Sequence, residues 1–240
     1  MMRIRLSMRR AALFLAFFAL ALAAVFPMRI LLGALGFGEA GLAVREVQGS
    51  IWNGRLLETQ FGAASLGDLD ARLNLLPLFV GRARVDLGRS GEKTTAFRGA
   101  VSITRHTLGV DDATMRLPTG ATFAPLPVTA LDLSDVSVRY RGGACERAEG
   151  LVRAEIQGEM AGLSLPGGLS GTARCDGENL LLPLASQSGM EMLALRIGRN
   201  GGYTADLTIR STDADMQRTL QAAGFSASGD GYRLSVAGTL

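Results

Sequence analysis

The sequence predicts a mainly β protein with a single N-terminal transmembrane helix. A strongly curved antiparallel β-sheet, shaped like an open half-barrel, follows it, and one short helix lies in the C-terminal region. Three observations lead to this prediction. Residues 11–26 are apolar and uncharged, apolar and polar residues alternate with a period of two in later segments, and many of the 31 glycines stand between those segments. We therefore expect a cytoplasmic stub and membrane anchor at 1–32 and an exported β domain at 33–240.

The N-terminal segment has the features of an export signal or an anchor. Four arginines precede the apolar run: Arg3, Arg5, Arg9 and Arg10. By the positive-inside rule they place the N-terminus in the cytoplasm and the rest across the membrane. The run through Met28 has 18 residues, at the short end for a membrane-spanning helix. A cleaved signal peptide, with Ala-Leu-Ala at 21–23 as its cleavage site, is the alternative. We favour the anchor because apolar residues continue to Phe37.

The charge distribution argues against nucleic-acid binding. The formal net charge is +3, but without the four N-terminal arginines 21 basic residues face 22 acidic ones. No dense basic patch with interleaved aromatic residues is present, as a nucleic-acid interface would require. We expect no nucleic-acid partner.

Alternating segments predict the strands of a meander. They are 69–75, 82–87, 131–140, 152–157, 193–197, 203–210 and 232–236. Within 131–140 the alternation changes phase near Ser134-Asp135, which predicts a β-bulge. Asn200-Gly201-Gly202 predicts a hairpin. About ten to twelve strands of ordinary length fit the chain. Each strand has one apolar face, which a curved sheet, a partner or a lipid-like ligand must cover; a sandwich is the alternative.

One helix is predicted in the C-terminal region, over 212–224. Thr212 and Asp215 have the spacing of a capping box, and Gly224 occupies the position that follows the last turn. Met216, Leu220 and Ala223 form its apolar stripe.

The two cysteines, Cys145 and Cys175, are predicted to form a disulfide. An even number of cysteines in an exported chain favours pairing. Neither has a second Cys or His within a few residues, so the sequence does not indicate a zinc site. Two unpaired buried thiols are the alternative.

The sequence offers little for catalysis. His106 is the single histidine, with Asp111 and Asp112 nearby, and we expect those two carboxylates to lie in a turn after Gly109. No nucleophile elbow, phosphate-binding loop or metal-binding motif is present. We predict that the protein is not an enzyme and has no metal or cofactor.

The segment Gly49-Ser50-Ile51-Trp52-Asn53-Gly54 follows the predicted anchor, and Asn53-Gly54 predicts a turn. In this order with the anchor, a leucine-rich strand with proline at 73–87 and the cysteine pair, it resembles the type II secretion system protein N family. Gly49, Ser50, Trp52 and Gly54 match that family's motif. Trp52 is predicted to cap one end of the sheet; an interface with a partner or with lipid headgroups is the alternative.

The resemblance implies a component of the inner membrane of a Gram-negative bacterium, single-pass, with its β domain in the periplasm. It would support export of folded proteins through contacts with other type II secretion subunits, namely the inner-membrane platform and, as a further candidate, the secretin connector. The family is also similar to AsmA-like proteins, whose curved sheets hold an apolar groove. A lipid-handling envelope protein is therefore the alternative function.

Overall fold

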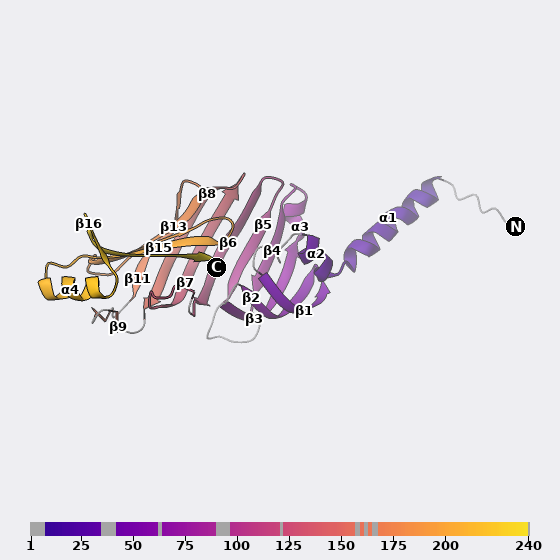
Figure 1. Ribbon diagram of the computed structural model, residues 1–240. Coiled ribbons are helices and arrows are strands. Elements are labelled where there is room, and N and C mark those ends of the chain that lie inside the picture. Colours follow the sequence, from indigo (N-terminus) through magenta and orange to yellow (C-terminus); the bar gives the residue numbers. More distant parts are fainter. Residues whose placement is uncertain are drawn as a thin grey trace.

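A computed structural model describes residues 8–34, 42–61, 64–89, 97–120, 122–156, 159–160, 163–164 and 168–239. One open antiparallel sheet of 15 strands dominates this part of the chain (Figure 1). Its strands are β1 (Leu42–Ser50), β2 (Asn53–Phe61), β3 (Ala64–Asn74), β4 (Ala83–Gly88), β5 (Arg98–Ile103), β6 (Thr107–Pro118), β7 (Val128–Arg141), β8 (Ala144–Ile156), β11 (Leu169–Thr172), β12 (Arg174–Asp176), β13 (Asn179–Ala185), β14 (Glu191–Ile197), β15 (Gly202–Ile209), β16 (Ser226–Ser228) and β17 (Gly231–Thr239).

The strands follow one another almost in chain order, as the prediction of a meander requires. The order is β1-β2-β3-β4-β5-β6-β7-β8-β11-β13-β14-β15-β17-β16, and β12 pairs with β13 beside this path. β9 (Glu159–Met160) and β10 (Leu163–Ser164) form a separate pair. The strands outnumber the ten to twelve expected because several have only two to four residues, too short for an alternating pattern to reveal them.

The predicted alternation places apolar side chains on one face. Leu73 lies opposite Val85, and Val85 lies opposite Val101, so β3, β4 and β5 align their apolar positions across the sheet. The hairpin at 200–202 is also confirmed, since Ile197 pairs with Tyr203 across it. The register therefore follows from the sequence pattern along most of the sheet.

Bulges bend three of the strands. Glu58 in β2, Asp112 in β6 and Asp135 in β7 have positive φ angles of 49°, 53° and 50°, and the pairing register shifts beside each of them. Asp135 confirms the bulge predicted near Ser134-Asp135. Each bulge inserts one residue into its strand and increases the local twist, which promotes curvature of the sheet.

The sheet curls so that its apolar face closes on itself in the C-terminal half. The ring centroids of Phe123, in the β6–β7 connection, and Tyr203, on β15, are 4.9 Å apart. The Tyr203 hydroxyl donates a hydrogen bond to the Thr122 carbonyl oxygen. Figure 1 shows β15 and β17 lying crosswise to β5–β8. One core cluster fills this curl, and a second, around Met28, Leu56 and Leu69, lies under β1–β5.

The N-terminal helices are α1 (Met8–Ala24) and α2 (Met28–Ala34), and α1 projects away from the sheet (Figure 1). Within the described residues, no helix has both the length and the apolar character needed to cross a bilayer; α1 has 17 residues. The predicted transmembrane helix is therefore not supported. Arg3 and Arg5 lie outside the described residues, whereas Arg9 is exposed and Arg10 belongs to α1.

Two local predictions need correction. The predicted C-terminal helix is α4 (Ala214–Ala222), and its N-cap is Asp213, whose side chain accepts a 2.9 Å hydrogen bond from the Asp215 backbone N–H; Thr212 is not the cap. The leucine-rich segment at 73–87 is not one strand, because β3 ends at Asn74 and the short helix α3 (Leu75–Leu78) interrupts it. The run of apolar residues at 75–80 has no alternation, which is why it cannot continue a half-buried strand.

Candidate functional site

The motif at 49–54 forms the tip of the β1–β2 hairpin. Ser50 pairs with Asn53, so Ile51 and Trp52 make a two-residue turn. The turn predicted at Asn53-Gly54 therefore lies two residues earlier in the chain. Gly49 faces Gly54 across the hairpin and has a φ of +83°. A Cβ on Gly49 would lie 2.4 Å from the Asn53 carbonyl oxygen. Position 49 therefore requires glycine both for its backbone conformation and for space.

The same hairpin tip holds the link between α1 and α2. The Ile51 backbone N–H donates a 3.0 Å hydrogen bond to the Phe26 carbonyl oxygen, and Pro27 forms an isolated bridge with Ser50. Met28 is fully buried, and a Cβ on Gly54 would lie 2.9 Å from its Cγ. Gly54 thus leaves room for Met28, and the motif attaches the helical N-terminus to the corner of the sheet.

Trp52 lies half-buried at this corner. Its side chain packs against the second core cluster, which includes Met28, Ile51 and Leu56, and Phe26 packs against the same cluster. The tryptophan thus adds to the contacts between the hairpin and the α1–α2 link. The hairpin tip also contacts β3, because the Leu73 N–H donates a 2.8 Å hydrogen bond to the Ile51 carbonyl oxygen.

A cluster of charged side chains occupies the polar face of β4–β8. Asp111 lies in the middle of β6, so the predicted turn at this position is wrong. Its carboxylate can be buried because it is paired with arginines. The nearest nitrogens of Arg82, Arg84 and Arg139 are 2.6, 3.2 and 4.0 Å from it. Asp112 occupies the adjacent bulge, and its N–H donates to the Ser137 hydroxyl at 2.9 Å. A small cavity of about 170 Å³ lies here.

Acidic neighbours stabilise the charge of Arg84. Burial lowers the pKa of Arg84, but the hydrogen bond and charge of Asp86 and the charges of Asp111 and Asp112 outweigh it and hold the pKa above its ordinary value. The charges of this cluster pair with one another across neighbouring strands, which indicates a structural role.

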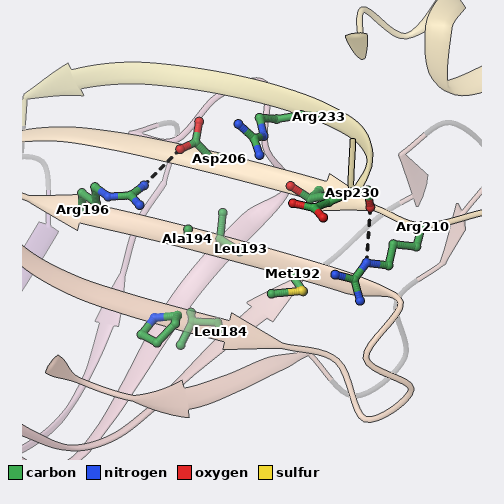
Figure 2. A pocket seen from close by; sticks show the side chains of 11 residues that line it. Leu184, Met192, Leu193, Ala194, Arg196, Asp206, Arg210, Asp230 and Arg233 are labelled. Atoms are coloured by element: carbon green, nitrogen blue, oxygen red, sulfur yellow. Dashed lines mark hydrogen bonds and ion pairs between the residues drawn. The ribbon is translucent and has the colours of Figure 1, made fainter. Parts of the chain in front are cut away.

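A second cavity, of about 260 Å³, lies on the polar face of β13–β15 and β17 (Figure 2). Arg196 is 3.0 Å from Asp176 and 3.2 Å from Asp206. Arg210 Nε donates to the Asp230 carbonyl oxygen at 3.2 Å. Arg196, Arg210 and Arg233 line this cavity together with apolar side chains that include Leu184 and Met192 (Figure 2), and neither a histidine nor a cysteine lines it.

Cys145 and Cys175 form a disulfide, as predicted from the cysteine count. Cys145 is the second residue of β8 and Cys175 lies in β12, and their Cα atoms are 5.5 Å apart. β12 pairs only with β13 among the described strands. The bridge therefore attaches the short strand β12 covalently to the long strand β8.

Comparisons with known proteins test the family resemblance that the sequence suggested. The family model described as type II secretion system (T2SS), protein N, matches residues 40–235. The chain belongs to the type II secretion system protein N family. It is 28% identical over 151 residues to the type II secretion system protein N of Vibrio cholerae serotype O1, covering 58% of this chain and 60% of that protein. The chain thus spans less than two thirds of the length of that relative. No solved structure matches it.

The region matched by the type II secretion protein N family contains the hairpin motif, both cysteines and nearly the whole sheet. Helices α1 and α2 precede it. The motif residues that the sequence singled out therefore lie where the family region joins the N-terminal helices. The sequence analysis did not single out Met28, which fills the space that Gly54 leaves. Nothing in the residues around Gly54 indicates that this glycine contacts a side chain far away in the chain.

The remaining candidate for chemistry, His106, does not belong to a site. It is exposed in the β5–β6 turn, where its backbone N–H donates to the Thr104 hydroxyl at 3.3 Å. In the part of the chain that the structure describes, no group of three or more His, Cys, Asp or Glu side chains is arranged to hold a metal ion. Asp111 is engaged with the arginines of its own cluster instead.

Proposed function

We propose that this chain is a non-catalytic component of the type II secretion system, and that it supports export of folded proteins by contacts with other subunits of the machine. The family match over residues 40–235 carries this proposal. The candidate partners are the inner-membrane platform and the secretin connector. In this proposal the β domain lies on the periplasmic side of the inner membrane. The Cys145–Cys175 disulfide supports that location, because structural disulfides persist in oxidising compartments.

The edge strand β1 is the surface that we assign to a subunit contact. Among the described strands, β1 pairs with β2 alone and has nine residues, whereas β16 at the opposite edge has three. A long edge strand presents unpaired N–H and C=O groups that can add a strand from another chain. The isolated bridge from Pro27 covers only the Ser50 end of β1. α2 also contacts β1, but among the described residues no further strand pairs with its outer edge, which leaves that edge as a candidate for a partner strand.

Complementation tests the proposed function. In a Gram-negative strain that lacks its own protein N, the chain should restore release of a type II-secreted protein into the medium. If the folded secreted protein stays in the periplasm although the chain accumulates normally, the proposal is wrong.

Site-specific crosslinking tests the edge. A photo-crosslinking amino acid at Gln48 or Arg45, both exposed on β1, should capture a secretion subunit in intact envelopes. The matched control is Arg153, exposed on β8 in the middle of the sheet. Equal yields from β1 and β8, or capture of no secretion subunit, would rule out the edge as the contact.

The lipid-handling alternative is favoured by one observation. Leu108 and Val110 lie on the face of β6 that carries the apolar register and are 39% and 38% exposed. Their face is thus less covered than that of β13–β15, where Leu193 and Leu207 are buried. Native mass spectrometry of the chain discriminates the two functions. Phospholipid that co-purifies with it and is lost in Leu108→Asp would support lipid handling, whereas lipid-free protein that binds a secretion subunit supports the first proposal.

A further inference from the structure

A run of apolar side chains protrudes from the β3–β4 connection. The exposed fractions are 53% for Leu75, 78% for Leu76, 86% for Phe79 and 81% for Val80, and Leu78 is 39% exposed. The backbone of this loop is ordered by its own hydrogen bonds, from the Val80 N–H and the Arg82 N–H to the Pro77 carbonyl oxygen at 3.1 and 3.0 Å. The loop thus holds its apolar side chains out in a fixed turn. Contiguous exposed apolar surface of this kind marks an interaction site.

This loop lies at the same corner of the sheet as the N-terminal helices. The Leu73 N–H, one residue before the end of β3, bonds to Ile51 O, and the Ile51 N–H bonds to Phe26 O between α1 and α2. Two backbone hydrogen bonds therefore connect the start of the loop to the base of α1. Val25 and Ile30, at that base, are 73% and 48% exposed. We call Val25, Ile30 and the loop 75–80 together the apolar corner.

The helical N-terminus that adjoins the apolar corner carries only basic charges. Between residues 8 and 34 the charged residues are Arg9, Arg10 and Arg29. Arg82, next to the loop, is instead paired with Asp111 at 2.6 Å. Arg29, in α2, is exposed. Two copies of the chain that met through this corner would bring like charges together, which disfavours self-association. An apolar surface flanked by arginine fits an anionic lipid surface, where apolar side chains enter the interface and arginine side chains reach the headgroups.

We propose that the apolar corner contacts an anionic lipid bilayer, with the loop 75–80 inserted at the boundary between headgroups and acyl chains beside the base of α1. The contact does not require any helix to cross the bilayer. It would also orient the sheet on the membrane, because the hairpin tip connects the start of the loop to the α1–α2 link by backbone hydrogen bonds. This inference concerns lipid contact and stands whether or not the chain serves in secretion.

Tryptophan fluorescence tests the proposal on the full chain. In a Trp52→Phe background, Phe79→Trp places the single tryptophan on the loop, and Leu151→Trp places it on β8, where the native leucine is 52% exposed. Val25→Trp reports on the base of α1. Each protein is incorporated into phosphatidylglycerol–phosphatidylcholine nanodiscs with or without brominated acyl chains, which quench tryptophan at the lipid interface.

The expected result is a blue shift and a loss of emission for Phe79→Trp in brominated discs, and neither for Leu151→Trp. Quenching of Val25→Trp without quenching of Phe79→Trp would overturn the proposal, because the loop would then face water. Absence of quenching at both positions would overturn it as well. A blue shift of Phe79→Trp that depends on protein concentration, without lipid, would assign the corner to a second copy instead.

Discussion

The space that Gly54 leaves for Met28 makes a specific prediction about coupling between two residues that are 26 positions apart in the chain. A Cβ on Gly54 would lie 2.9 Å from Met28 Cγ and 3.2 Å from Met28 Cβ. Carbon atoms pack at about 3.5–4.0 Å, so Gly54→Ala forces Met28 to move by roughly 0.5–1 Å. We expect Gly54→Ala to lower the free energy of unfolding by about 1–3 kcal/mol through overpacking. Met28→Ala should cost about 2–5 kcal/mol, because Met28 is fully buried.

The double variant distinguishes a specific clash between positions 28 and 54 from independent losses of stability at each position. Met28→Ala removes the shortest contact, at 2.9 Å, while those with Met28 Cβ and the Ser50 carbonyl oxygen, both at 3.2 Å, remain. Gly54→Ala with Met28→Ala should therefore cost less than the sum of the single changes, by roughly 0.5 kcal/mol or more. Gly49→Ala is the matched control in the same hairpin. Its Cβ would meet the Asn53 carbonyl oxygen, which no side-chain truncation removes. We expect its positive φ to cost about 1–3 kcal/mol, with the clash against the Asn53 carbonyl oxygen in addition, and the total to add to Met28→Ala without coupling.

The assay is urea denaturation of the purified full chain, followed by fluorescence of Trp52. The single tryptophan packs in the same cluster as Met28 and therefore reports on this corner. A double-mutant cycle gives the coupling energy directly. If Gly54→Ala and Met28→Ala are additive, or if Gly49→Ala couples to Met28 as strongly as Gly54→Ala does, the hairpin does not hold the α1–α2 link in the way described.

Asp213→Ala should destabilise the protein by about 1 kcal/mol while Thr212→Ala leaves it unchanged, because Asp213 caps α4; equal melting temperatures of the two variants would contradict the cap. Reduction of Cys145–Cys175, or a double Cys→Ala change, should cost about 3–4 kcal/mol given the separation of 30 residues; denaturation midpoints with and without reductant test this, and unchanged midpoints would refute it. Burial raises the pKa of Tyr140 above its ordinary value of 10.0, against a smaller opposing effect of the Leu180 backbone. The folded protein then holds this proton more tightly than the unfolded chain, so the free energy of unfolding should fall as the pH rises beyond about 10, and Tyr140→Phe should remove that part of the decline. An identical alkaline decline in the variant would assign it to other groups.

Local patterns predicted the strands well, for reasons visible in particular segments. Residues 69–75 and 203–210 alternate strictly, and both lie in half-buried strands. β15 has nearly the predicted bounds, whereas β3 begins earlier than predicted, at Ala64. The phase change at Ser134-Asp135 marked a real bulge. One inserted residue shifts by one position the alternation of core-facing and solvent-facing residues, and this shift is visible in the sequence. Asp112 carried no such signal, since two adjacent aspartates look the same in a bulge and in a turn.

The functional candidates were predicted in part. The cysteine pair was predicted because even cysteine counts in exported chains favour pairing, and the motif around Trp52 was singled out. The turn was predicted at Asn53-Gly54, two residues too late, because Asn-Gly is a strong turn signal. The pairing of Ser50 with Asn53 shows that Ile51 and Trp52 make the turn. The segment 75–80 was expected in a strand, whereas it forms a short helix and an exposed loop.

By itself, the sequence determined the period of the strands, the meander order, the bulge in β7 and the short helix near the C-terminus. These features depend on contacts between near neighbours, and side-chain periodicity records them directly. Only the tertiary structure decided that Phe123 meets Tyr203, that Asp111 is buried among arginines, and that the loop 75–80 lies beside the base of α1. The first and the last of these contacts join segments that neither follow one another nor pair, and Asp111 also reaches Arg84 of β4 across the intervening strand β5. Such contacts depend on how far the sheet curls and twists, a property summed over many strands that no single segment encodes.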